Sequence, residues 1–499
     1  MGAQLALLIC SVGVAGLFFL NRDKSVRTSK ALWLPVIWLW IAGSRSVSVW
    51  FGTSTGSANA LGATLDGSPM DAAIYESLIV AGIIVMFLRR DRATALLKVS
   101  GPVLIYFLYC MMSTAWSPFP GPAFKRWTKD VGDLVMVLVI VTDVQPVSAL
   151  RRLYSRIGFI LLPFSVVLIR YTDLGRGYDP DGGPENTGVT TNKNSLGLIV
   201  FLVSLGALWN IRALLLDKEA PNRTRRLVAQ GTLLTFGIAL LQMAHCATAI
   251  ACFVLGGGLM LATSLRAVRN RPGRVHAICL GIVLAGGLTM LLGGQSIVTS
   301  ALGRQSNLSG RTDIWKASIA AADNPVFGTG FESFWNANVD KVALGLHGYW
   351  QIRNLVSAHN GYIEVYLDLG WVGLSLIALI LISGYRRAAR AFQRDRELGG
   401  LLLAYVVTSA FYSITEAGFR VLDPSWIFLL LAVVSASGVA AGLFGGKRSR
   451  ILASRGGVAP TALIPEKETV YASRGGLIEC VIALTQAMST NAQFGHSMQ

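Results

Sequence analysis

Charged residues are scarce in this sequence. They make up 14% of the chain, and 53% of it is hydrophobic, whereas a typical soluble protein carries roughly 25% charged residues. Acidic residues are the scarcer sign, with 27 Asp and Glu against 44 Lys and Arg and a net charge of +17. This composition excludes an ordinary soluble globular protein and indicates a basic membrane protein.

Several functional patterns are also missing. The six cysteines are scattered without a CxxC pair, which argues against a cysteine zinc site or a disulfide framework. Apart from Asp179-Pro-Asp181, the polar segments contain no Asp-x-Asp stretch, and no Asp-x-Asp or His/Asp cluster there has a convincing metal-site pattern, so we expect neither a metal nor a cofactor. The N-terminus lacks a basic n-region and a small-residue cleavage site, so 3–20 is expected to be a retained helix. No basic helix with interleaved aromatics occurs, so we expect no nucleic-acid partner.

Apolar stretches of membrane-spanning length are abundant and are separated by short polar breaks. We therefore expect an all-α, polytopic membrane protein of about 12–13 transmembrane helices in a lipid bilayer. The expected spans lie near 3–20, 31–47, 73–88, 99–113, 131–147, 155–170, 194–213, 229–243, 247–265, 275–293, 361–385, 399–416 and 425–445.

The basic residues give the orientation. Most of them fall in alternate connections and in the C-terminal tail, at 22–30, 89–98, 151–156, 212–226, 266–274, 386–396 and after 446. The positive-inside rule places these segments in the cytoplasm. The C-terminus is therefore expected inside the cell, and the remaining connections outside it.

The longest polar segments divide the chain. We expect N-terminal transmembrane helices over 1–293 with external loops at 114–130 and 171–193, an extracytoplasmic loop subdomain at 294–360, C-terminal transmembrane helices over 361–445, and a flexible cytoplasmic tail at 446–499. Because connections between helices are normally short, chemistry is expected in the three long external segments.

Cations on the external side run against the charge bias, and an anionic ligand would explain them. The candidates among these 13 cations are Lys125, Arg126, Arg176, Lys193, Arg304 and Arg311. Trp116 and Trp127, which flank the first two, fit an interfacial aromatic belt equally well. Beside Lys193, Asn192 or Ser195 would cap a helix whose N–H groups suit a phosphate, although capped helices are also common without a ligand.

The third external segment contains a predicted amphipathic helix at 311–323, on which Arg311 and Trp315 share a face. Asn324-Pro325 is expected to end this helix, and Gly328-Thr-Gly330 to form a tight turn. The segment 171–193 is rich in Gly, Pro and Asp and is predicted to be irregular, with neither strand nor helix.

His359 lies at the end of the third segment. A lone histidine is most often a satisfied polar residue. Here Asn360, Glu364 and Asp368 follow it at a four-residue spacing, on one face of an expected helix. Carboxylates in a span are costly and often functional, so they would orient the imidazole or share its proton.

Together these residues resemble the O-antigen ligase and polymerase family of bacterial cell envelopes (the Wzy_C signature) over about 110–430. The resemblance is carried by the stretch 192–197 and by the series Arg311, Trp315, Pro325, Gly328, Gly330, His359, Asn360, Gly370 and Gly373. Its exopolysaccharide-polymerase branch, the ExoQ-like proteins, looks most similar, on the basis of Ser113, Trp116-Ser117, Lys125-Arg126, Ile414-Thr415-Glu416 and Trp426.

The sequence departs from the family at Ala247, where ligases of the family tend to carry an arginine. The stretch here reads His245-Cys-Ala-Thr-Ala. Alanine at this position occurs in the polymerase-like group, so the departure favours a polymerase. It also removes one cation from a phosphate-binding site, which Lys193, Arg176 or His245 would have to replace.

The resemblance implies a metal-independent, GT-C-like glycosyltransferase in the bacterial inner membrane, with its active loops in the periplasm. The donor would be a polyprenyl-diphosphate-linked oligosaccharide and the acceptor a glycan, with other polysaccharide-export proteins as further partners. The implied catalytic residues are His359, Arg311 and Glu364. The implied substrate-binding residues are Lys193, Asn194, Lys125, Arg126, Arg176, Arg304, Trp315, Asn360 and Glu416.

Two alternatives stay open. The protein could be a ligase that attaches a finished glycan to a lipid or protein, since the sequence does not name the acceptor. It could also be a transporter or flippase for lipid-linked or anionic solutes. Transporters usually show internal repeats and broken mid-membrane helices, and no convincing repeat relates the two halves, so we favour an enzyme.

Overall fold

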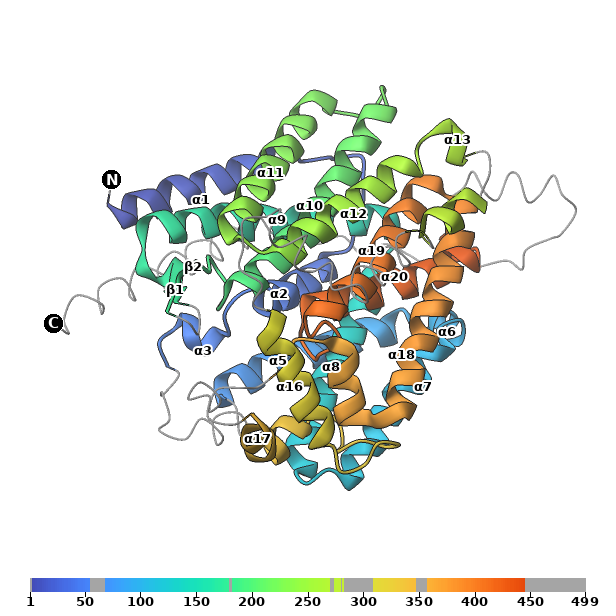
Figure 1. Ribbon diagram of the computed structural model, residues 1–499. Coiled ribbons are helices and arrows are strands. Elements are labelled where there is room, and N and C mark those ends of the chain that lie inside the picture. Colours follow the sequence, from blue (N-terminus) through green and yellow to red (C-terminus); the bar gives the residue numbers. More distant parts are fainter. Residues whose placement is uncertain are drawn as a thin grey trace, which may run out of the picture.

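The computed structural model describes residues 2–53, 68–178, 182–269, 273–279, 281, 308–346 and 357–444. Within this part the chain is almost entirely helical (Figure 1), which confirms the all-α membrane fold. Three expectations lie outside the described residues: the position of Arg304, most of the span at 275–293, and the whole tail at 446–499.

Seven described helices are long and apolar enough to cross a membrane. They are α1 (Ala3–Leu20), α5 (Pro69–Leu88), α9 (Pro146–Tyr171), α10 (Lys193–Leu216), α11 (Arg223–Ala244), α18 (Gly361–Arg394) and α19 (Arg396–Thr415). An eighth span exists if α6 (Arg90–Lys98) and α7 (Gly101–Ser113), which meet at an angle of 89°, are counted as one.

Four of the expected spans are shorter or more polar than a simple transmembrane helix. The spans at 31–47, 247–265 and 425–445 correspond to η1 (Lys30–Leu32) with α2 (Trp33–Ala42), to α12 (Ala247–Ala262) and to α20 (Pro424–Ala440). The span at 131–147 corresponds to the second half of α8 (Pro120–Val141) and the turn after it, and α8 buries Asp130 and Asp133. These two carboxylates accept hydrogen bonds from the indoles of Trp426 and Trp38, both at 2.7 Å.

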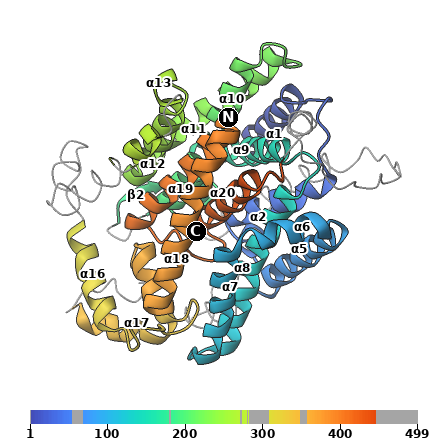
Figure 2. The same ribbon diagram turned by 90° about the vertical axis from the view of Figure 1, so that its right-hand side faces the viewer.

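The centre of the helical bundle is formed by α10, α19 and α20 (Figures 1 and 2). Residues 424–439 of α20 are all buried, as expected for a helix that is apolar on every side. By contrast, α1 and α5 expose large apolar side chains, including Leu8, Val12, Phe87 and Leu88. An extended exposed apolar surface of this kind suits contact with lipid.

The remaining elements are short and lie between the long helices. They are α3 (Val47–Trp50), η2 (Thr114–Trp116), η3 (Asp173–Gly175), β1 (Arg176–Tyr178), β2 (Pro184–Asn186), α13 (Arg266–Arg269), α16 (Leu308–Ala320) and α17 (Phe334–Gly345). In Figure 1, α16 and α17 lie at the bottom, at the other end of the molecule from the α10–α11 connection. They pack on the first turns of α18 through Phe334, Trp335 and Leu367.

Two of the predicted loops are partly regular. The segment 171–193 contains the antiparallel pair β1–β2, so the prediction of no strand there was wrong. The segment 114–130 is mostly helix, because α8 begins at Pro120, and proline is favoured in the first turn of a helix. Lys125 and Arg126 are therefore helical residues.

The part of the 294–360 segment that contains Gly328 and Gly330 packs against a break in α18. At Gly370 the backbone is non-helical, with φ +65°. The segment 325–330 fills the break: Trp371 N donates to Pro325 O at 2.9 Å, and Gly330 N donates to Asp368 O at 2.8 Å. An added Cβ at Gly370 would lie 2.2 Å from Val326 O, so only glycine fits this close crossing of two backbones.

Candidate functional site

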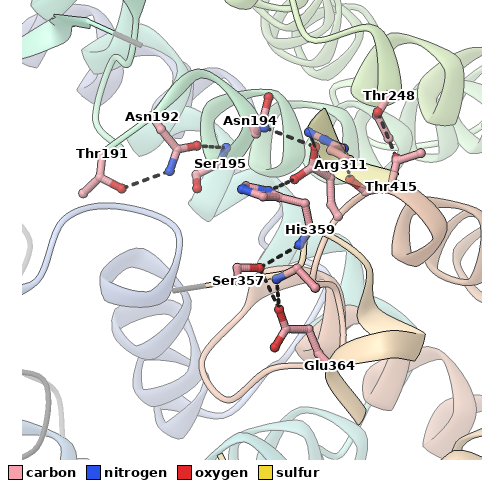
Figure 3. Close-up of polar contacts among 12 residues, drawn as sticks. Thr191, Asn192, Asn194, Ser195, Thr248, Arg311, Ser357, His359, Glu364 and Thr415 are labelled. Atoms are coloured by element: carbon pink, nitrogen blue, oxygen red, sulfur yellow. Dashed lines mark hydrogen bonds and ion pairs between the residues drawn. The ribbon is translucent and has the colours of Figure 1, made fainter. Parts of the chain in front are cut away.

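The site is centred on one carboxylate, Glu416, which directly follows α19. Its Oε1 accepts hydrogen bonds from Arg311 Nη2 at 3.2 Å and from Asn194 Nδ2 at 3.1 Å. Its Oε2 lies 3.3 Å from His359 Nδ1. The side chain of Glu416 is only 8% exposed. Three predicted site residues, one each from α16, α10 and the segment before α18, therefore converge on Glu416 (Figure 3).

The backbone holds Glu416 beside the start of α18. Its carbonyl accepts hydrogen bonds from Gly361 N at 3.0 Å and from Gly418 N at 2.9 Å. Gly361 is the first residue of α18 and follows the His359-Asn360 pair directly. An added Cβ at Gly361 would lie 3.0 Å from Phe419 and Ser413, so this close approach depends on glycine.

His359 occupies an unusual backbone position. Its φ is +48°, in the left-handed region that non-glycine residues rarely adopt. Its N–H donates to Ser357 Oγ at 3.0 Å, and Asn360 caps α18 by accepting from the N–H groups of Tyr362 and Ile363. Its side chain is 43% exposed. The strained backbone therefore sets the imidazole at the surface of the site with one edge against Glu416.

The hydrogen-bonding roles on the His359 ring follow from its partner. An ionised carboxylate only accepts hydrogen bonds, so Nδ1 must carry the hydrogen when it bonds to Glu416. In the neutral ring, Nε2 is then the atom with the lone pair. The pair Glu416–His359 is thus arranged to present a proton acceptor at Nε2.

Arg311 is fixed by α16. Besides Glu416, its guanidinium donates through Nη1 to the carbonyl of Thr415. One turn further along the same face, Trp315 Nε1 donates to Ala358 O at 2.7 Å. The predicted common face of Arg311 and Trp315 is therefore the face that meets the segment leading into α18.

The start of α10 forms another side of the site. Asn192 Oδ1 accepts from Ser195 N at 2.9 Å, which confirms the predicted helix cap. Lys193 Nζ lies 3.8 Å from Glu185 Oε2 on β2, and Asn194 reaches Glu416. The N-terminal end of α10 also carries the partial positive charge of the helix dipole. Two cations and a helix N-terminus are thereby gathered within one region.

Glu364 and Asp368 do not face His359, contrary to the expected pairing. Glu364 accepts from Trp335 Nε1 at 2.7 Å, from Ser357 Oγ at 2.9 Å and from Ala358 N. Asp368 Oδ1 accepts from the N–H groups of Ser333 and Phe334, both at 2.9 Å, and so caps α17. The two carboxylates hold residues 333–335 and 357–358 onto α18, and Glu416 is the carboxylate that meets the imidazole.

The other predicted cations make their observed contacts away from Glu416. Arg126 donates to Glu332 O, and Arg176 Nε donates to Ile169 O at 2.8 Å. Lys125 is exposed on α8. Glu332 also meets Arg420, a residue that the sequence analysis did not select, at 3.4 Å. The nearby negative charge of Glu332 raises the pKa of the Arg420 guanidinium.

A cavity of about 240 Å³ adjoins the start of α10. Thr191 and Ser195 line it on one side, and Arg420 and Asp423 on the other. Burial raises the pKa of the Asp423 carboxyl to about 6. The cavity therefore offers hydroxyl, guanidinium and carboxyl groups to a polar ligand next to the Glu416 cluster.

The position of the family arginine, Ala247, is the first residue of α12. Its neighbour Thr248 lies within hydrogen-bonding distance of Thr415, with Oγ1 atoms 3.0 Å apart. This position therefore adjoins the cluster, as Figure 3 shows for Thr248. Within the described residues, no three His, Cys, Asp or Glu side chains are grouped to hold a metal ion.

The central role of Glu416 was the main feature that sequence reasoning missed. It was selected only as one of several substrate-binding residues. A carboxylate at the end of an apolar helix is costly to bury, and that signal could have singled it out. Its partners were not readable, because Asn194 lies 222 positions away in the sequence.

Comparison with known proteins confirms the resemblance. A family model described as O-Antigen ligase matches residues 231–378, which include Arg311 and His359. The chain is also similar to the exopolysaccharide production protein ExoQ of Rhizobium meliloti (strain 1021). The two are 24% identical over 306 residues, covering 60% of this chain and 68% of ExoQ. The chain is thus similar to O-antigen ligases and to an exopolysaccharide production protein over part of its length, and its long apolar helices are those of a multi-pass membrane protein.

Proposed function

We propose that this protein polymerises oligosaccharide units carried on a polyprenyl diphosphate, as an exopolysaccharide polymerase of the bacterial inner membrane. The observation that carries the proposal is the convergence of Arg311, His359 and Asn194 on Glu416. A proton acceptor and a phosphate-binding cation held at one carboxylate suit glycan transfer from a diphosphate.

The site belongs on the periplasmic side in this proposal. The positive-inside rule assigns the basic connections to the cytoplasm. The α10–α11 connection is one of them, and α10 runs from the Glu416 cluster to that connection over its 24 residues. At about 1.5 Å per residue this is about 36 Å, enough to cross a bilayer.

In the proposed reaction, a hydroxyl of the acceptor glycan attacks the anomeric carbon of the donor sugar. The new carbon–oxygen bond forms as the bond between that carbon and the diphosphate oxygen breaks. The hydroxyl proton passes to Nε2 of His359, while Glu416 holds Nδ1–H and stabilises the imidazolium that forms. The diphosphate leaves on its lipid with the electron pair of the broken bond.

Arg311 and Lys193 are the proposed diphosphate ligands. A guanidinium pairs with two phosphate oxygens in a planar fork and stays charged at neutral pH. Both cations are already held by carboxylates, Arg311 by Glu416 and Lys193 by Glu185. They are therefore positioned before the donor arrives, which lowers the ordering cost of binding. Lys125, Arg126 and Arg176 remain proposed contacts with more distant parts of the substrate.

The cavity beside Ser195 and Arg420 is the proposed place for a sugar ring of one substrate. Its hydroxyl and charged groups offer the donors and acceptors that sugar hydroxyls need. Trp315 and Asn360 are then positioning residues, since both use their polar atoms to hold the Arg311 and His359 segments.

A ligase remains the second candidate, supported by the printed description of the matching family model, O-Antigen ligase. The two reactions share the donor and differ in the acceptor. Product analysis separates them: a polymerase yields a ladder of longer lipid-linked chains, whereas a ligase yields one product on a different lipid or protein acceptor.

The test is reconstitution of the purified full chain with lipid-linked oligosaccharide in vesicles. We expect a ladder of products from the wild type and from His276→Ala, whose ring contacts Tyr385 Oη at 2.6 Å, away from the Glu416 cluster. We expect loss of the ladder in His359→Ala. Elongation by His359→Ala at the wild-type rate would contradict the role of this residue.

A further inference from the structure

A second cavity lies at the opposite end of α10. It has a volume of about 380 Å³ and is formed by the ends of α1 and α10, the start of α9 and the beginning of α11. Ligand pockets typically start at about 300 Å³. In both views the α10–α11 connection lies at the end of the molecule opposite α16 and α17 (Figures 1 and 2). This cavity is therefore separate from the Glu416 cluster.

Three arginines line the cavity: Arg151, Arg152 and Arg226. The lining also includes two carboxylates, Asp23 and Asp217, and so keeps one positive charge. Glu397, outside the lining, is shared between Arg151 at 3.9 Å and Arg212 at 4.0 Å. Arg226 Nη1 donates to Asp23 Oδ2 at 2.8 Å. The remaining charge of the lining favours an anionic ligand.

Among the residues that the structure describes, two of these guanidinium groups each have one N–H donor without a hydrogen-bond acceptor. In the described part of the chain, the Nε–H groups of Arg151 and Arg226 are buried and meet no hydrogen-bond acceptor. A buried charged donor without an acceptor is costly, so such groups normally have a partner. The Nε atoms themselves are shielded from the cavity, but the side chains of Arg151 and Arg226 are 29% and 15% exposed, so an oxyanion in the cavity would meet their exposed parts.

An aromatic ring and two backbone carbonyls hold Arg151 and Arg152 in place. The guanidinium of Arg151 lies over the Trp209 ring at 4.8 Å. Arg152 donates to the carbonyls of Asp23 and Val26, at 2.9 and 2.7 Å. On the cavity wall, Gln230 Nε2 donates to Ser155 Oγ at 2.8 Å. The positively charged groups are thus pre-organised, which is a feature of binding sites more than of mobile surface charges.

We propose that this cavity binds a phosphate group of a small ligand, at the end of the molecule opposite the Glu416 cluster. A phosphate accepts two parallel hydrogen bonds from one guanidinium, as a carboxylate does, and its further oxygen can accept from a second arginine. The phosphate comes either from a soluble phosphate ester or from an anionic lipid headgroup. The site does not depend on the glycosyltransferase proposal.

The test uses the full-length protein in nanodiscs of phosphatidylcholine, with inorganic pyrophosphate as the soluble probe and phosphatidic acid as the lipid probe. Binding is measured by native mass spectrometry. We expect at least one probe to bind the wild type and to bind Arg311→Ala equally at one site, since pyrophosphate also fits the proposed diphosphate site at Arg311. We expect Arg226→Gln and Arg151→Gln to weaken it by at least about tenfold, the effect of losing a charge-assisted hydrogen bond.

The matched control is Arg225→Gln. Arg225 lies on the same turn of α11 as Arg226, and its replacement by glutamine removes the same charge. Its guanidinium lies over Phe19, 4.6 Å from the ring centroid. Binding in this variant should stay at the wild-type level. Equal weakening in all three variants would indicate a diffuse charge effect and overturn the proposal, as would absence of binding by both probes.

A second measurement uses the wild-type protein and so does not depend on the folding of a variant. Phenylglyoxal modifies accessible arginines, and mass spectrometry reports which ones. The bound probe should protect Arg151 and Arg226 and leave Arg225 unchanged. Unchanged labelling of Arg151 and Arg226 at a saturating probe concentration would contradict the site. Protection by pyrophosphate identifies a soluble ligand, and protection by phosphatidic acid alone identifies a lipid.

Discussion

Replacing Glu416 by glutamine tests the arrangement of the candidate site. The side chain keeps its shape but exchanges one oxygen for an NH₂ group. In the structure all the partners of the carboxylate are donors: Arg311 and Asn194 at Oε1, and His359 Nδ1 at Oε2. In either orientation of the amide, its NH₂ group faces a donor: Arg311 and Asn194 in one orientation, and His359 Nδ1 in the other.

The expected loss can be worked out from these contacts. If the amide oxygen stays with Arg311, the imidazole loses the acceptor that fixes its tautomer. A hydrogen bond to a charged group contributes about 1.5–3 kcal/mol, which corresponds to about 10- to 150-fold in rate. We therefore expect Glu416→Gln to elongate glycans about 10- to 150-fold more slowly than the wild type, per folded molecule.

The matched control is Glu364→Gln, which changes the same chemical group on a carboxylate that does not face His359. Its partners are Trp335, Ser357 and Ala358. We expect it to lower the free energy of unfolding by about 1–3 kcal/mol, with a smaller loss of activity per folded molecule. The assay is elongation of lipid-linked oligosaccharide in vesicles, normalised to monodisperse protein. Full activity in Glu416→Gln together with loss in folded Glu364→Gln would refute the assignment.

Three further predictions follow from other parts of the structure. Gly370→Ala should reduce the free energy of unfolding by more than about 2 kcal/mol, because φ is +65° and the added Cβ meets Val326 O. The measurement is a denaturant titration. The control is Gly258→Ala, whose added Cβ has nothing within 4 Å. The pKa of Asp423 is raised to about 6 from 3.8, so its contribution to stability is full below about pH 4 and is lost as the pH rises through 6. The melting temperature of the wild type should therefore fall relative to that of Asp423→Asn as the pH rises from 4 to 7. A difference in melting temperature that does not change with pH would contradict the raised pKa. Glycan elongation should continue after exhaustive chelation, and its abolition by chelator with restoration by a divalent cation would show that the reaction needs a metal.

The helices were readable from the sequence because their signals are local. Apolar length indicated the long helices, and the Asn192 cap and the shared face of Arg311 and Trp315 depend only on residues within one turn. The break in α18 was not readable. Gly370 looks like an ordinary helical glycine until the segment 325–330 is placed against it, and that contact forms only in the folded chain.

The pairing within the site was also beyond local reasoning. The four-residue spacing of Asn360, Glu364 and Asp368 along α18 made Glu364 the expected partner of the adjacent His359. In the structure His359 precedes the helix in a left-handed conformation, and this turns its ring away from the α18 carboxylates. The end of α19 then brings Glu416 to the ring. The helical spacing holds for Asn360, Glu364 and Asp368 but does not extend to His359, which lies outside the helix.

The central claim is that Arg311 assists departure of a lipid diphosphate. Its most direct test is the rate of lipid-diphosphate release from the lipid-linked donor, measured for purified Arg311→Ala and for Lys316→Ala, which removes an exposed cation from the same helix. The account predicts a loss of roughly 100-fold or more for Arg311→Ala and wild-type release for Lys316→Ala. Release by Arg311→Ala at the rate of the control would contradict it.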